Sequence, residues 1–85
     1  MSSLDLLKKK ILFLSIHRGT KEMDLLLNSF VKKYINAFDE KELVDLELLL
    51  QIDDEILYKW YFNKNEKNNS VPVNSVSEKL KCFKL

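Results

Sequence analysis

The stretch "MDLLLNSFVKKYINAFDEKELVDLELLL", residues 23–50, decides the fold of this chain. Its apolar residues recur every three or four positions in two blocks, and this spacing draws one apolar stripe along a helix. The first block predicts a helix over residues 21–36 with Leu27 and Phe30 on its buried face. The second predicts a helix from Asp39 through about Leu50, because Asp39 followed by Glu42 has the spacing of a capping box.

Helical spacing also extends to both sides of this stretch. Residues 4–16 form an amphipathic pattern behind Ser3, a residue type that favours the N-cap. The segment "DDEILYKWYF", residues 53–62, predicts a short helix capped by Asp53, with Leu57 and Trp60 in the core. Ser75 and Glu78 form a second capping-box pattern, which predicts a last helix over residues 75–85 that packs on the bundle or stays partly mobile.

Composition points to the same fold class. One Gly and one Pro in 85 residues leave few sharp turns, which counts against a sheet of many hairpins. With 46% hydrophobic and 32% charged residues, the chain is too apolar for intrinsic disorder. We therefore expect an all-α protein, a compact small bundle of four to five short helices. Residues 1–62 form the bundle, residues 63–74 a polar linker and residues 75–85 the C-terminal helix.

Several function classes are excluded by what the sequence lacks. The single Cys82 and the single His17 provide no set of metal ligands, so we expect no metal site. The first residues lack the order of a secretory signal, and no apolar run approaches the ~20 residues of a membrane span. We expect an intracellular protein without direct membrane insertion.

The charges are unevenly distributed although the net charge is only +1. Residues 39–55 carry eight acids against the single base Lys41, whereas residues 1–38 carry seven bases against three acids. The acidic half would repel a polyphosphate. This dipolar surface favours docking onto another protein.

His17, Arg18 and Gly19 are the only histidine, arginine and glycine of the chain, and they are consecutive. We expect Gly19 to end the first helix in the left-handed conformation, and Thr20 to cap the next helix. Arg18 either forms a local ion pair with Glu22 or is needed for its planar, bidentate fork, which the thirteen lysines cannot imitate. The selective use of arginine favours the second interpretation.

Other candidate sites have plainer explanations. No nucleophile accompanies His17, so a surface or helix-terminal histidine is favoured over a catalytic one. The pairs Asp39/Glu40 and Asp53/Asp54 stand where helices begin and acids are expected as caps. Trp60 is favoured as a core residue over a stacking platform for a ligand. The sequence thus indicates no catalytic residue.

"RGTKE", residues 18–22, resembles the Arg-Gly-x-x-Glu motif of the small succinate dehydrogenase assembly factors, the flavinylation factors of bacteria and mitochondria. Downstream, Asp53 or Asp54 with Leu57 and Trp60 resembles the acidic-x-x-Leu-x-x-Trp segment of that family. The resemblance covers about Lys8 to Phe62. Glu55 stands where many relatives have proline, and the segment after Phe62 shows little likeness.

The resemblance implies a non-enzymatic assembly factor, a chaperone that binds the flavoprotein subunit of succinate dehydrogenase or fumarate reductase and promotes covalent attachment of FAD to it. It would bind no cofactor tightly itself, would be a monomer when free, and would act in the bacterial cytoplasm or the mitochondrial matrix. The implied contact surface consists of His17, Arg18, Gly19, Lys21, Glu22 and Asp24.

Within that surface, we expect Arg18 to make bidentate bonds near the partner's flavin pocket, and Glu22 to orient Arg18 or pair with a base of the partner. Gly19 would let the partner's backbone approach closely. The alternatives are a small helical nucleic-acid-binding protein, whose affinity would fall steeply with salt, and a general protein-interaction adaptor that uses the same turn.

Overall fold

The computed structural model describes residues 3–16, 18–62 and 71–84. Over these residues the fold is all-α, as the sequence predicts, with five helices and no strand. The helices are α1 (Ser3–Leu14), α2 (Lys21–Tyr34), α3 (Glu40–Leu50), α4 (Asp54–Phe62) and α5 (Ser75–Cys82). None of them, within this described part, is long and apolar enough to cross a membrane.

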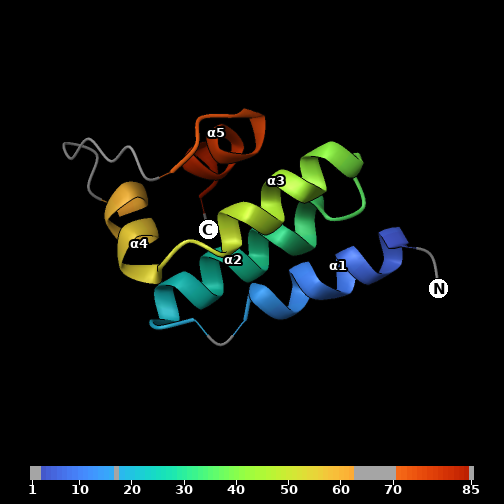
Figure 1. Cartoon of the computed structure of the whole chain (residues 1–85). Helices are drawn as coiled ribbons and strands as arrows, with labels where there is room; N and C mark the ends of the chain where they lie inside the picture. Colours follow the sequence, from blue (N-terminus) through green and yellow to red (C-terminus); the bar gives the residue numbers. More distant parts are fainter. Residues whose placement is uncertain (1–2, 17, 63–70, 85) are drawn as a thin grey trace.

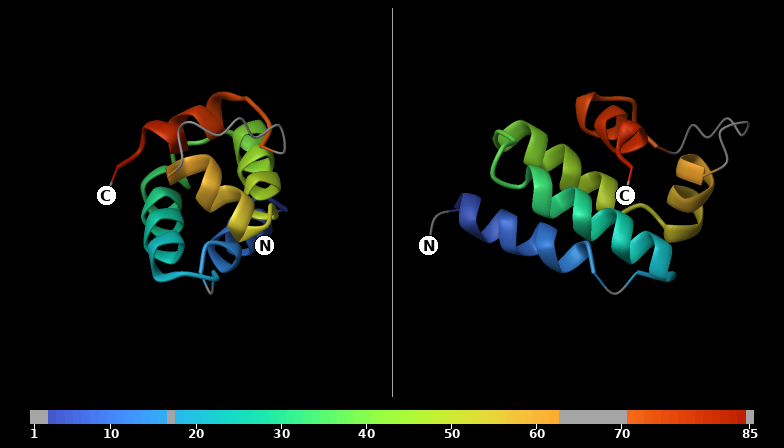
Figure 2. Two further views of the ribbon diagram at one scale, coloured as in Figure 1. Left: turned by 90° about the vertical axis from the view of Figure 1, so that its left-hand side faces the viewer. Right: turned by 180° about the vertical axis from the view of Figure 1, so that it is seen from behind.

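Three helices form the body of the molecule, which measures 42 × 25 × 20 Å. Helices α1, α2 and α3 run along its long dimension, and α1 contacts both α2 and α3 (Figure 1). Helix α4 crosses one end of these three helices, and α5 lies across the side away from α1 (Figure 2). The end covered by α4 is also where α1 stops and α2 starts, so this arrangement brings the connection between α1 and α2 close to the start of α4.

The starts of α2 and α3 follow the predicted capping chemistry. The side chain of Thr20 accepts the backbone N–H of Met23 at 3.2 Å. Asp39 accepts the N–H of Glu42 at 2.8 Å, and the Glu42 carboxylate accepts the N–H of Asp39 at 3.2 Å. This reciprocal pair is the predicted capping box, and it satisfies two N–H groups that lack partners inside the helix.

Other boundaries differ from prediction. Ser3 already lies inside α1, and α1 ends at Leu14 instead of residue 16. The hydroxyl of Ser15 donates to the carbonyl of Leu12 at 2.7 Å, and such side-chain bonding competes with the regular helix ladder. Helix α2 likewise ends at Tyr34, two residues early.

The cap of α5 lies one residue before the predicted one. Asn74 accepts the N–H of Ser77 at 2.9 Å, and the Ser77 hydroxyl accepts the N–H of Asn74 at 2.9 Å. The predicted box of Ser75 with Glu78 is therefore wrong. Asparagine and serine each reach a backbone N–H across the same first turn, so two overlapping patterns competed in this sequence.

The four predicted core residues are all buried. Leu27, Phe30 and Leu57 have no exposed surface, and Trp60 is 8% exposed. Leu4, the first residue of the predicted apolar stripe of α1, is instead 39% exposed. Farther along α1, Leu7 and Leu14 are partly buried against the core and Ile11 is fully buried.

The C-terminal helix docks through an aromatic cluster. The Phe83 ring lies edge-on to Phe30 at 5.4 Å between centroids, and the Tyr61 hydroxyl donates to the carbonyl of Phe83. Burial raises the pKa of Tyr61 above its ordinary value of 10.0. Of the linker predicted over residues 63–74, residues 63–70 lie outside the described residues, and Val71 is buried.

We expect Tyr61→Phe to lower the free energy of unfolding by about 0.5–1.5 kcal/mol at neutral pH, because one hydrogen bond to α5 is lost. The raised pKa favours the neutral phenol in the folded chain. The stability that the Tyr61 phenol contributes is therefore complete below its pKa in the unfolded chain. It is lost as the pH rises through its pKa in the folded chain.

Denaturant unfolding of both proteins between pH 7 and pH ~11 checks this, since the phenol of an unperturbed tyrosine titrates near 10. The stability difference between them should shrink at the alkaline end. Tyr58→Phe, at a half-exposed position, is the control. A stability difference that stays constant or widens as the pH rises would contradict a stabilising hydrogen bond from Tyr61 to Phe83.

Candidate functional site

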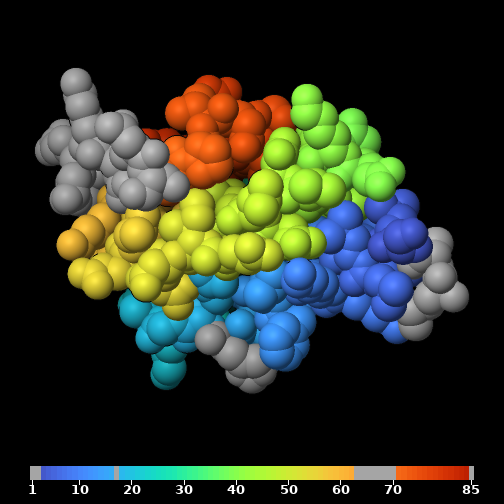
Figure 3. Space-filling view, viewed as in Figure 1, coloured from blue at the N-terminus to red at the C-terminus, as the bar shows by residue number. Residues whose placement is uncertain are grey.

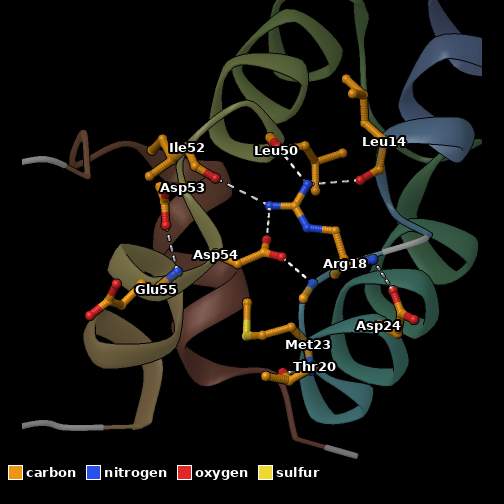
Figure 4. Close-up of polar contacts among 11 residues, drawn as sticks. Leu14, Arg18, Thr20, Met23, Asp24, Leu50, Ile52, Asp53, Asp54 and Glu55 are labelled. Carbon is orange, nitrogen blue, oxygen red and sulfur yellow. Dashed lines mark hydrogen bonds and ion pairs between the residues drawn. The ribbon is translucent and has the colours of Figure 1, made fainter.

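The guanidinium of Arg18 lies inside the fold and bonds to four acceptors (Figure 4). Nη1 donates to the carbonyls of Leu14 at 2.9 Å and Leu50 at 2.7 Å. Nη2 donates to the carbonyl of Ile52 at 3.2 Å and pairs with Oδ1 of Asp54 at 2.5 Å. Only 9% of the side chain is exposed. The two terminal amino groups of the fork are thus fully used within the chain.

Three of these acceptors come from the ends of different helices, and the Ile52 carbonyl lies between α3 and α4. Leu14 and Leu50 are the last residues of α1 and α3, and Asp54 is the first residue of α4. Carbonyls at a helix C-terminus have no partner within the helix and lie at the negative end of its dipole. A cation with several donors in one plane satisfies them together, whereas the ammonium of lysine would not span them.

Asp54 connects the arginine to the residue beside it. One carboxylate oxygen pairs with Arg18, and the other accepts the backbone N–H of Gly19. Its neighbour Asp53 accepts the N–H of Glu55 at 2.9 Å and caps α4, as predicted. The two consecutive acids therefore have different tasks: Asp53 completes its own helix, while Asp54 bonds to the turn between α1 and α2.

Gly19 does not have the conformation expected of it. Its φ lies outside the left-handed region, and α1 already ends at Leu14, five positions before it. The prediction that Gly19 closes the helix in a left-handed conformation is wrong. A Cβ at this position would lie 3.1 Å from Oδ2 of Asp54, closer than most real contacts. Glycine allows the carboxylate to reach the backbone here.

Asp24 holds the same turn from the other side. Its carboxylate accepts the backbone N–H of Arg18 at 2.5 Å, from the first turn of α2. The turn is therefore bonded to α2 through its backbone and to α3 and α4 through the Arg18 side chain. His17, which the sequence also places in the contact surface, lies outside the described residues.

Lys21 and Glu22 face outward. Both are exposed, in the first turn of α2. Arg18 pairs with Asp54 and not with Glu22, so the ion pair considered from the sequence does not form. Among the described residues, none of the salt bridges involves Glu22. Its side chain is exposed to solvent.

Exposed apolar side chains surround the turn. Phe13 is 67% exposed, Leu25 60%, Tyr58 40% and Ile16 39%. Shallow hollows of about 400 to 490 Å³ lie between them: one joins Gly19 to Tyr58, one runs between Phe13 and the α3–α4 connection, and one lies beside Leu25. In the space-filling view the end of α1 and the start of α2 lie directly against the yellow α3–α4 connection (Figure 3). Clustered apolar exposure of this kind marks interaction surfaces.

The site contains groups that sequence reasoning missed. From the sequence, Asp54 is one of two acids at a helix start, and nothing in the sequence indicates a role for the carbonyls of Leu14, Leu50 and Ile52. A backbone carbonyl leaves no trace in the identity of its residue, so only the tertiary structure reveals that three of them converge. The spacing of Asp54 to Leu57 and Trp60 was the one available signal for the acid.

We expect Arg18→Lys to lower the free energy of unfolding by about 2–4 kcal/mol, because buried carbonyls lose their donors and lysine has no fork to replace them. Lys21→Ala, a change at the exposed neighbour of the turn, should alter stability by less than about 0.5 kcal/mol. Chemical denaturation monitored by circular dichroism measures both. Equal stability of Arg18→Lys and the unsubstituted protein would refute the structural role.

Similar proteins carry related names. The chain is 40% identical over 81 residues, 95% of its length, to "Succinate dehydrogenase assembly factor 2, mitochondrial" of Dictyostelium discoideum, covering 55% of that protein. It is 35% identical over 77 residues to the protein of the same name in Saccharomyces cerevisiae, covering 91% of this chain and 47% of that one. It is 33% identical over 57 residues to "FAD assembly factor SdhE" of Acetobacter pasteurianus, covering 67% and 52%.

The chain thus spans about half the length of the curated relatives it matches. No solved structure matches it significantly. The match to the family described as "Flavinator of succinate dehydrogenase" extends over residues 9–84, from the middle of α1 past the end of α5. This stretch contains the Arg18 turn and every group that bonds to it, and the chain belongs to that family of flavinators of succinate dehydrogenase.

Proposed function

We propose that this protein is an assembly factor that binds the flavoprotein subunit of succinate dehydrogenase, or of fumarate reductase, and promotes covalent attachment of FAD to it. The observation that carries the proposal is the ordered Arg18–Glu22 turn in a chain of the flavinator family. The turn is held rigidly by internal bonds and is rimmed by exposed apolar side chains. A preformed surface of this kind binds a partner without a large ordering cost.

The residues of the contact surface that we propose fall into two groups: some face solvent, and others bond within the chain. Gly19, Lys21 and Glu22 are exposed and would meet the partner directly. His17, which lies outside the described residues, stays a predicted member of this surface. Arg18 and Asp24 would act mainly by shaping the turn, because their polar groups already bond within the chain. A bidentate bond from Arg18 to the partner stays a prediction, and it would require exchange of at least one internal acceptor.

The apolar rim adds area to this surface. Phe13 near the end of α1 and Leu25 in α2 precede and follow the turn in sequence, and Tyr58 of α4 lines one hollow together with Gly19. Large apolar and aromatic side chains contribute most of the energy in protein interfaces, whereas exposed ion pairs contribute little. We therefore expect the apolar side chains of Phe13, Leu25 and Tyr58 to provide most of the affinity for the partner. The polar groups of the turn would determine how the two proteins are oriented.

In this proposal the chain is not an enzyme. The flavin and the histidine that receives it belong to the partner, and this protein binds no FAD tightly by itself. It would act as a free monomer in the compartment where the flavoprotein matures, the cytoplasm of a bacterium or the matrix of a mitochondrion. The acids Asp53, Asp54 and Glu55 next to the turn argue against the nucleic-acid alternative, since they would repel phosphates.

Co-expression with a candidate flavoprotein subunit tests the proposal. Covalent flavin keeps its fluorescence on that subunit in a denaturing gel, while bound but unattached flavin is lost. We expect the fluorescent band to depend on this protein. A band of equal intensity without it would overturn the proposed function.

We expect Glu22→Ala to reduce the yield of covalent flavin by about tenfold, the equivalent of ~1.4 kcal/mol of lost interaction with the partner. Its stability should stay within about 0.5 kcal/mol of the unsubstituted protein, because Glu22 is exposed. Glu40→Ala is the matched control, since Glu40 is an exposed acid in the first turn of α3. A similar loss in both variants would point to a general charge effect and would count against a specific role of Glu22.

A further inference from the structure

We propose that Asp54 is a positioning residue for the partner-binding turn: its carboxylate sets the direction in which Gly19 and the start of α2 face the flavoprotein. The inference rests on the proposed function and concerns a residue outside the Arg-Gly-x-x-Glu motif. It assigns to Asp54 no contact with the partner. Asp54 would act through Arg18 and Gly19.

The contacts of Asp54 support this role. Its two oxygens bond to a side chain and a backbone N–H of consecutive residues, Arg18 at 2.5 Å and Gly19. Its side chain is 27% exposed, while that of Glu55, the next residue, is 76% exposed. Asp54 is the first residue of α4, so its bonds position the turn relative to that helix. Gly19, in the turn, lies 35 residues away in sequence.

A carboxylate is suited to this double bond. An ionised carboxylate accepts from two donors at once through separate oxygens, and charge-assisted bonds of this kind are the stronger ones. An asparagine would retain one acceptor oxygen, and its amide NH₂ would face one of the donors. The first turn of a helix also favours a negative charge at this position.

The same geometry explains why residue 19 is glycine. A Cβ there would meet Oδ2 of Asp54 at 3.1 Å, and the backbone conformation itself does not require glycine. The glycine therefore accommodates Asp54, an internal group. Glycine is then needed at residue 19 to make room for Asp54. The effect of a side chain at residue 19 should therefore depend on whether the Asp54 carboxylate is present.

The first experiment compares Asp54→Ala with Asp53→Ala in the full chain. Both remove an acid at the start of α4, but Asp53 only caps the helix. We expect Asp54→Ala to reduce both the yield of covalent flavin and the affinity for the flavoprotein subunit by about tenfold or more, because small misplacements of a positioned group are costly. Asp53→Ala should lower the melting temperature while the yield stays within about twofold.

The second experiment tests the coupling between the two positions. Gly19→Ala should reduce the yield about tenfold in the unsubstituted protein and less than about twofold further in Asp54→Ala, because the two changes disrupt one contact. An equal additional loss in Asp54→Ala would mean that the effect of a side chain at residue 19 does not depend on the Asp54 carboxylate, and would overturn the proposal. Unchanged yield and affinity in Asp54→Ala would also overturn it.

An NMR measurement on the isolated protein provides a readout that needs no partner. Asp54→Asn and Asp54→Ala should both shift the Gly19 amide resonance and speed its hydrogen exchange, while Asp53→Ala leaves both unchanged. Asp54→Asn retains one acceptor, so it serves if Asp54→Ala does not fold. A lost Gly19 bond with full flavinylation would refute positioning. Failure of the unsubstituted protein to promote flavinylation would refute the proposed function, while the NMR result would still report on the bond.

Discussion

The bonds of the Arg18 guanidinium hold together the end of the molecule where four helices meet. One side chain satisfies carbonyls at the ends of α1 and α3, a carbonyl between α3 and α4, and the first acid of α4. Asp24 adds the start of α2 through the Arg18 backbone. A buried cation is costly unless its charge is paired and its donors are bonded. Arg18 meets this requirement at its two terminal amino groups, while its buried Nε has no hydrogen-bond partner.

This constraint explains how one short motif can serve both the fold and the recognition that we propose. Within residues 18–24, some groups bond inward and others face solvent. Arg18, the Gly19 N–H and Asp24 define the shape of the turn, while Lys21 and Glu22 remain exposed on it. A domain of this size buries a small core, so loops are not held by surrounding structure and need their own bonds. Polar contacts provide that order here without covering the outer surface.

The opposite side of the molecule is stabilised differently. There α5 docks through rings, with Phe83 edge-on to Phe30 and the Tyr61 hydroxyl bonded to the Phe83 carbonyl. Apolar burial is non-directional, so ring packing specifies the placement of a helix less strictly than hydrogen bonds do. Several directional hydrogen bonds meet at the turn, where orientation matters for the proposed contact.

The sequence by itself determined the fold class, the four core residues Leu27, Phe30, Leu57 and Trp60, and the caps Thr20, Asp39 and Asp53. These depend on local periodicity and on bonds within one helical turn, which neighbouring residues reveal. It also directed attention to Arg18 through the rarity of arginine. Only the tertiary structure decided what Arg18 bonds to, why residue 19 is glycine, and which of two consecutive acids reaches the turn. Those answers depend on backbone carbonyls and on a carboxylate 35 residues away, and no local pattern records groups that meet only when the helices pack.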